Sequence, residues 1–139
     1  MILQRDPRLN PVLQKYGCYL MSILFLANKY TNCELGVGMI NEIFQILIDH
    51  GYVEEDGYVR DPERVFSFMG LPVYYYDQHL PPTQDCEKHE IEILMFKRDS
   101  WRHFVVGDGK GHVAYDPYGV SRAVTEGRLI SKRIFKILR

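Results

Sequence analysis

The chain has 139 residues, of which 46% are hydrophobic and 25% are charged. This length fits one domain spanning residues 1–139, and these proportions are typical of a folded globular protein, which excludes wholesale disorder. Seventeen basic residues nearly balance eighteen acidic ones, so no strong overall field attracts nucleic acid or an anionic membrane surface. We therefore expect no nucleic-acid partner.

The N-terminal segment MILQRDPRLNP carries charge and proline where a secretory signal peptide needs a continuous apolar stretch. The apolar runs elsewhere are too short to cross a membrane, so we expect a cytoplasmic protein without membrane insertion. The three cysteines, Cys18, Cys33 and Cys86, show neither a C-x-x-C pair nor histidines at zinc-ligand spacing. We expect no disulfide framework, no metal and no cofactor, and the sequence carries no signal for a particular oligomeric state.

The first half of the chain has the periodicity of helices. Apolar residues recur at three- and four-residue steps over residues 18–30, which predicts an amphipathic helix of about three turns. A second helix is predicted from about residue 36 to residue 50, with Gly51 as its C-terminal stop. A short third helix is predicted over residues 62–70, because Asp61 can cap its N-terminus.

The second half of the chain is rich in β-forming residues. Strands are predicted within residues 71–77, 91–98 and 134–138, and a hairpin is predicted within residues 103–116. An irregular loop with paired prolines, residues 78–90, separates the first two strands. Helices followed by an antiparallel sheet indicate an α+β domain.

The predicted hairpin brings two polar side chains together. A tight turn at Gly109-Lys110 places His103 opposite Asp116. Directly opposed residues of an antiparallel pair share one face, with Cβ atoms about 4.5–5.5 Å apart, so Asp116 can orient the imidazole of His103. His112 shares this face and is a rival base, but no carboxylate is predicted opposite it.

Cys18 stands at the start of the first predicted helix, directly behind a glycine. The unpaired N–H groups and the dipole of a helix N-terminus favour a thiolate over a thiol. If this end of the helix packs against the hairpin, Cys18, His103 and Asp116 supply a nucleophile, a base and an orienting carboxylate. The alternative interpretations are a cysteine that only fills the core and an aspartate that only starts a turn.

The motifs YGC and HFVVGDGKGHVAYDPYG, in this order, resemble the papain-like cysteine peptidases. The resemblance is closest to the bacteriocin-processing peptidases that remove double-glycine leaders and to their stand-alone and phage-associated relatives. It implies a papain-like fold, in which an N-terminal helix carrying the cysteine packs on an antiparallel sheet carrying the histidine and the aspartate. It also implies hydrolysis of a peptide or isopeptide bond in a peptide or protein substrate.

In that family, a glutamine upstream of the cysteine helps to form the oxyanion hole, usually six residues before the nucleophile. Val12 occupies that position here, Gln14 lies four residues before Cys18, and Gln4 can reach the site only if a loop intervenes. Gln14 is therefore the expected oxyanion donor, and Tyr19 replaces the small residue that commonly follows the family's cysteine. Two alternatives stay open: a catalytically impaired papain-like fold that binds peptides or acts as an interaction module, and a phage-type cell-wall peptidase.

Overall fold

The computed structural model describes residues 1–76 and 80–138. Within these residues, four helices come first: α1 (Pro11–Tyr16), α2 (Cys18–Thr31), α3 (Val37–Asp49) and α4 (Pro62–Phe68). They are followed by β1 (Val73–Tyr75), β2 (Glu90–Arg98), β3 (Trp101–Gly107), β4 (Val113–Tyr115), α5 (Arg122–Glu126) and β5 (Arg128–Ile137). The strands form one sheet in the order β1-β5-β2-β3-β4, and each neighbouring pair is antiparallel. The α+β prediction is confirmed.

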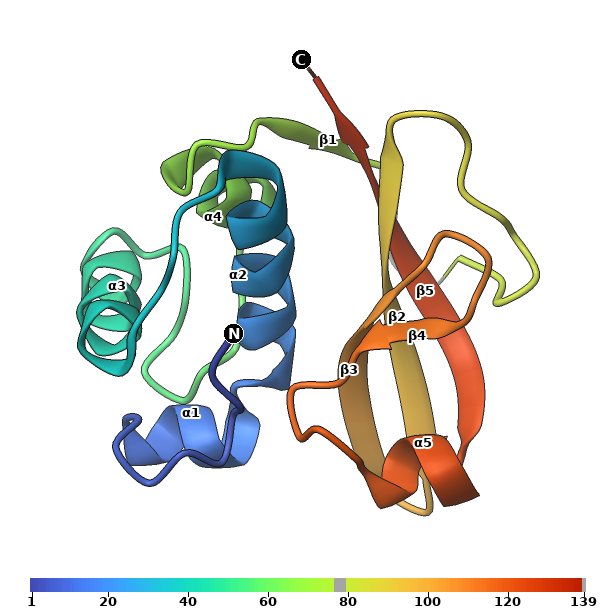
Figure 1. Ribbon diagram of the computed structural model, residues 1–139, viewed down its shortest axis with the longest axis horizontal. Helices are drawn as coiled ribbons and strands as arrows, with labels where there is room; N and C mark the ends of the chain where they lie inside the picture. The colour runs from blue at the N-terminus through green and yellow to red at the C-terminus, as the bar shows by residue number, and fades with distance from the viewer. Residues whose placement is uncertain (77–79, 139) are drawn as a thin grey trace.

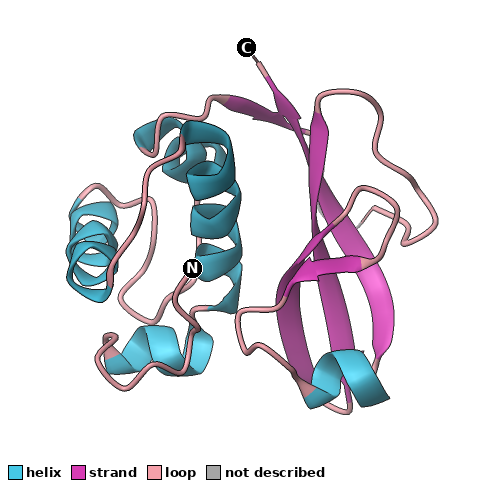
Figure 2. Ribbon diagram, viewed as in Figure 1, coloured by secondary structure: helices cyan, strands magenta, loops and turns pink. Residues whose placement is uncertain are grey.

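Helix α2 lies between α3 and the sheet (Figure 1, Figure 2). On the sheet side, the ring of Phe25 stacks on Tyr115 with centroids 4.1 Å apart, and Tyr19 meets Phe104 edge-on at 4.7 Å. The short helix α5 lies at one end of the sheet and packs through Ala123 on a second apolar cluster. The contact of Tyr19 with Phe104 holds the start of α2 close to β3.

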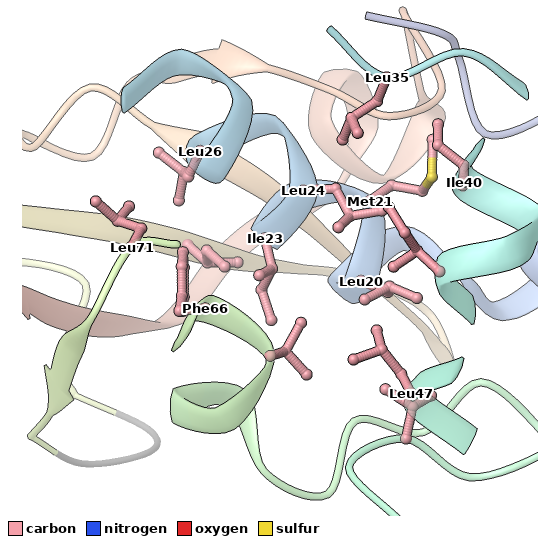
Figure 3. Close-up of a cluster of buried hydrophobic side chains, with 14 of the residues drawn as sticks. Leu20, Met21, Ile23, Leu24, Leu26, Leu35, Ile40, Leu47, Phe66 and Leu71 are labelled. Carbon is pink, nitrogen blue, oxygen red and sulfur yellow. The ribbon is translucent and has the colours of Figure 1, made fainter. Parts of the chain in front are cut away.

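The main core surrounds α2 on most of its sides (Figure 3). The five consecutive residues 20–24 are all buried, whereas an amphipathic helix would bury only one stripe of them. The sequence predicts such a stripe because it does not reveal that α3 and α4 also pack against α2, with α4 contacting β1 of the sheet as well. Figure 3 shows Leu20, Met21, Ile23 and Leu24 of α2 among apolar side chains from the neighbouring elements.

The predicted helices and strands are found, with two differences in extent. Helices α1 and α5 are additional, and each begins after a capping side chain, Asn10 and Ser121 respectively. Strand β5 begins at Arg128, well before the predicted residue 134, because it pairs with both β1 and β2 in the middle of the sheet. The first predicted strand shortens to β1, and part of it, together with the start of the proline loop, lies outside the described residues.

The predicted register of the hairpin is wrong. Strands β3 and β4 pair Val106 with Tyr115 and Gly107 with Val113, with a bulge between the two pairs, and Asp116 follows the end of β4. The loop is wider than a tight turn because the carboxylate of Glu92 accepts hydrogen bonds from the N–H groups of Gly109 and Gly111, each at 2.9 Å. The same side chain fills the space beside Gly107, where a Cβ atom would overlap it.

Within residues 1–76 and 80–138, no helix combines the length and the apolar character needed to span a bilayer.

Candidate active site

Cys18 is the first residue of α2, and Gly17 joins this helix to α1. A Cβ atom at Gly17 would lie 2.5 Å from the carbonyl oxygen of Leu13 and 2.8 Å from its Cα, so only glycine fits this junction without a shift. The N-cap residue of α2 is Gly17, which has no side chain to cap the first turn. The thiol therefore stands at the positive end of a 14-residue helix.

His103 on β3 contacts Asp116 even though the two residues are not paired across the strands. His103 Nε2 lies 2.7 Å from Asp116 Oδ1, and the two residues are only 1% and 7% exposed. The turn after β4 supplies the remaining partners of the carboxylate, because Ser121 Oγ donates to Oδ2 at 2.6 Å and the N–H of Tyr118 donates to Oδ1 at 2.9 Å. Asp116 thus both forms a turn and fixes the imidazole.

The electrostatics of this pair favour a charged imidazole. Burial by itself lowers the pKa of His103, but hydrogen bonding to Asp116 and to Cys18, with the negative charges of both, outweighs burial and raises this pKa to about 9. Burial pushes the pKa of Asp116 upward, and its hydrogen bonds with His103, Ser121 and Tyr118 lower it overall. The arrangement stabilises an imidazolium beside a carboxylate.

The second nitrogen of His103, Nδ1, is the one left for the thiol. It is buried, and none of the described residues offers it a partner in full hydrogen-bonding geometry, although Cys18 is near enough to influence the pKa of the ring. Ser22 ties the first turn of α2 to β3, since its hydroxyl donates to Cys18 O at 2.8 Å and lies 3.4 Å from Phe104 O. This contact sets the position of the cysteine against the histidine strand.

Aromatic rings enclose the imidazole. The ring centroids of Trp101 and Tyr118 lie 5.1 Å and 4.7 Å from that of His103, and the guanidinium carbon of Arg5 lies 4.7 Å from the centre of the Tyr118 ring. Such rings limit the access of water to the imidazole and strengthen its electrostatic interactions.

A cavity of about 680 Å³ opens beside these residues. Its walls come from the N-terminal segment, the α1–α2 junction, the loop before α4 and the strands β1, β3 and β5, and they combine aromatic with cationic side chains. The lining residues are Gln4, Lys15, Tyr16, Cys18, Tyr19, Asp56, Gly57, Tyr58, Val59, Pro62, Tyr75, Trp101, Arg102, His103, Phe104, Tyr118 and Arg133. A volume of this size accommodates several residues of a peptide or a small organic ligand.

The structure brings Gln4, and not Gln14, to this cavity. Gln14 Nε2 donates to the carbonyl oxygen of Leu9 at 2.7 Å, and Gln14 is not among the described residues that line the cavity. Gln4 is 1% exposed, its backbone N–H donates to Pro117 O at 2.8 Å, and its Nε2 donates to Gln14 O at 3.3 Å. Its Oε1 is buried without a partner among the described residues.

The other described histidines and cysteines do not line the cavity. His112 is exposed and bonds Asp108 through Nδ1 at 3.1 Å, so a carboxylate does accompany this rival base, but outside the cavity. Cys33 is exposed, whereas Cys86 is half-buried, and burial together with Glu92 raises the pKa of its thiol to about 12. His79 lies outside the described residues, and the described part of the chain holds no group of three or more His, Cys, Asp or Glu side chains placed for a metal.

Sequence reasoning missed three residues of the site. The sequence analysis puts Gln4 out of reach because it does not predict α1, and this short helix lies between Gln4 and Cys18 while the N–H of Gln4 donates to Pro117 O. The one sequence signal for α1 is Asn10-Pro11, a typical helix start. Ser121 and Tyr118 follow the Asp-Pro turn, and Ser121 at a helix N-cap was the only hint that this segment is ordered around Asp116.

The comparison with protein families gives one match. Residues 1–137 match the family described as "Protein of unknown function, DUF261", and because this span covers nearly the whole chain, the chain belongs to that family. Neither the curated proteins nor the solved structures yielded a match.

Proposed function

We propose that this member of the DUF261 family is a thiol-dependent hydrolase of papain-like architecture that cleaves a peptide or isopeptide bond. The observation that carries the proposal is the placement of Cys18 at the start of α2, beside the buried pair of His103 and Asp116 and at the edge of a large cavity. A nucleophile, a base and a group that orients the base are the parts that such catalysis requires.

The proposed mechanism routes both proton transfers through one ring nitrogen of His103, Nδ1, while Nε2 stays bound to Asp116. Because Nε2 of His103 is bound to Asp116, Nδ1 takes the thiol proton, and the thiolate attacks the carbonyl carbon of the substrate. The backbone N–H of Cys18 and the amide of Gln4 stabilise the oxyanion, with Gln4 replacing Gln14 in this role. His103 then protonates the leaving amine, and water hydrolyses the thioester.

A second candidate function is that of a peptide-binding module which retains this fold without turnover. It is favoured by the burial of Cys18, which is only 9% exposed, and by the bulky Tyr19 that follows it and packs on Phe104. In this case the cavity binds its ligand while the thiol stays covered.

The reactivity of Cys18 toward iodoacetamide distinguishes these functions. We expect Cys18 to be alkylated at least about tenfold faster than Cys33 at pH 6, because an ordinary thiol has well under 1% thiolate there and a neighbouring imidazolium stabilises the thiolate. Cys86 should be slowest, since burial opposes its ionisation. Peptide mass mapping after timed alkylation measures all three rates in one sample.

Two variants serve as a matched pair for this experiment. His103→Ala should reduce the rate at Cys18 to that of Cys33, whereas His112→Ala should leave it unchanged, because His112 is exposed and outside the cavity. Equal rates at Cys18 and Cys33 in the wild-type protein would refute the hydrolase and leave the binding module as the function.

A further inference from the structure

We propose that the cavity beside Cys18 recognises its substrate through a carboxylate group, which the guanidinium of Arg133 binds. The inference deepens the hydrolase proposed above and rests on it for the chemical step, but it concerns binding alone. The carboxylate belongs either to an acidic side chain or to the C-terminus of a peptide.

Arg133 is a buried cation that lines the cavity. It lies on β5 opposite Ile93 of β2 and is 6% exposed. Its Nη1 donates to Ser131 Oγ at 3.1 Å, and its guanidinium carbon lies 4.7 Å from the centre of the Phe104 ring. Among residues 1–76 and 80–138, no carboxylate lies within ion-pair distance of it.

The preceding residue on β5 shows how this protein treats a buried cation that has a structural role. Lys132 is fully buried and its Nζ lies 2.7 Å from Oε1 of the equally buried Glu92. Taking a charge out of water costs several kcal/mol unless an opposite charge compensates it. Within the described chain Lys132 has that compensation and Arg133 does not, which indicates that the counter-charge of Arg133 arrives with a ligand.

The surroundings of Arg133 suit a carboxylate. Tyr19, Tyr58 and Tyr75 line the same cavity, and the side chains of Tyr19 and Tyr75 interact through a hydrogen bond. Burial raises the pKa of Tyr19 well above its ordinary value of 10, so its phenol remains a neutral donor. A guanidinium fork matches the two oxygens of a planar carboxylate, and phenolic donors beside it add further hydrogen bonds.

The other charged side chains that line the cavity are mostly positive, like Arg133. Lys15 and Arg102 are the other lysine and arginine residues among its described lining, and Asp56 is the one acidic residue there. This local excess of positive charge contrasts with the net charge of −1 of the whole chain and attracts an anionic ligand. In a peptide, the anion available for recognition is a carboxylate.

Ligand binding to the Cys18→Ser protein tests the proposal without thiol chemistry. Trp101 is the only tryptophan of the chain and lines the cavity, so its fluorescence reports occupancy. One pair of ligands, acetyl-Ala-Glu-Ala-amide and its Gln counterpart, tests a side-chain carboxylate. A second pair, acetyl-Ala-Ala-Ala with a free acid or an amide end, tests a terminal carboxylate.

We expect the acid of one pair to bind at least about tenfold more tightly than its amide, since a hydrogen bond to a charged group contributes about 1.5–3 kcal/mol. Arg133→Gln in the same background should abolish this ratio, Arg133→Lys should retain part of it, and Arg128→Gln on the exposed start of β5 should leave it unchanged. Thermal unfolding of each variant verifies the fold, and Tyr19→Phe, which removes one phenolic donor, should reduce the ratio even if Arg133→Gln does not fold.

Ratios near one in both ligand pairs would overturn the proposal, and so would a preference that survives in a folded Arg133→Gln protein. An acid preference that depends on Arg133, found together with an unreactive Cys18, would uphold the carboxylate site and refute only the hydrolase.

Discussion

The two nitrogens of the His103 ring have different neighbours, and this asymmetry determines what the residue can do. Nε2 is bound to Asp116 in a buried contact of 2.7 Å, and Nδ1 is left on the side of Cys18. Because Asp116 also accepts hydrogen bonds from Ser121 and Tyr118, it cannot turn away from the imidazole without losing three partners. The imidazole is therefore held in one orientation, as the proposed base would require.

The raised pKa of His103 links this residue to the stability of the protein. A pKa raised from 6.5 to about 9 means that the contribution of His103 to stability is fully present below about pH 6.5 and is lost as the pH rises through about 9. The lowered pKa of Asp116 acts in the opposite sense. Its contribution to stability is fully present above about pH 3.8 and is lost as the pH falls through the lowered pKa that Asp116 has in the folded protein. We expect the stability difference between wild type and His103→Gln to be largest between about pH 4 and 6.5 and to shrink toward pH 9, as measured by urea unfolding.

An NMR titration of the imidazole provides the control for this stability experiment. The wild-type ring of His103 should titrate near pH 9, and Asp116→Asn and Cys18→Ser should each lower that midpoint, because each removes one of the groups that raise the pKa. A midpoint near pH 6.5 in the wild-type protein would show that the pKa of His103 is not raised and would contradict the expected pH dependence of stability.

At the scale of elements, the junction of α1 and α2 determines where the cysteine lies. Gly17 is the only residue between the two helices, and the backbone of Leu13 leaves no room for a side chain there. Gln4, the proposed oxyanion donor, is held near this junction because its backbone N–H donates to Pro117 O and its Nε2 donates to Gln14 O of α1. Gly17 thus places the proposed nucleophile directly after the helix that holds the proposed oxyanion donor.

Replacement of Gly17 by alanine should disturb this junction. The added Cβ atom would force Leu13 and the start of α2 apart, and overpacking of this kind costs about 1–3 kcal/mol of stability. We also expect slower alkylation of Cys18, because its distance from His103 changes. Urea unfolding and the iodoacetamide assay measure the two effects.

Gly38→Ala is the matched control for Gly17→Ala. Gly38 lies in α3, where a Cβ atom meets nothing within 4 Å, so the substitution should stabilise the helix by up to about 1 kcal/mol and leave Cys18 unaffected. Equal effects of the two substitutions would show that the junction has no special role.

The elements were largely predictable from the sequence, and the details of the site were less so. Helices α2, α3 and α4 have clear periodicity or capping signals, and the α+β order follows from them. The hairpin register was not predictable, because it depends on Glu92, a residue of another strand whose carboxylate enters the loop. The expected neighbours His103 and Asp116 do meet, but through the turn after β4 and not through strand pairing.

At the scale of the whole molecule, two polar features lie on the sheet. The cavity contains Arg133 and the catalytic candidates, whereas Lys132 and Glu92 form a buried ion pair that holds the β3–β4 loop. Neighbouring residues of a strand point to opposite faces, so Lys132 and Arg133 serve these two features separately. The loop and the cavity are thereby anchored to the same segment of β5.

Removal of one member of the buried ion pair should be costly. Lys132→Met leaves the Glu92 carboxylate without its cation, and an uncompensated buried charge costs about 3–5 kcal/mol. The double variant with Glu92→Gln should lose less, because glutamine is neutral and still accepts hydrogen bonds from Gly109 and Gly111. Chemical unfolding of the two single variants and the double variant tests this, and a double variant as unstable as the sum of the singles would contradict it.

The order of the site residues along the chain has a consequence for synthesis. Cys18 is made early, but its proposed base and the carboxylate that orients it come from residues 103 and 116, which are 85 and 98 positions later. At roughly 5–20 residues per second, the ribosome needs about 5–20 s to cover that interval. During this time the nascent thiol has no base, so the reactivity proposed for Cys18 can arise only after the sheet has been completed beside α2.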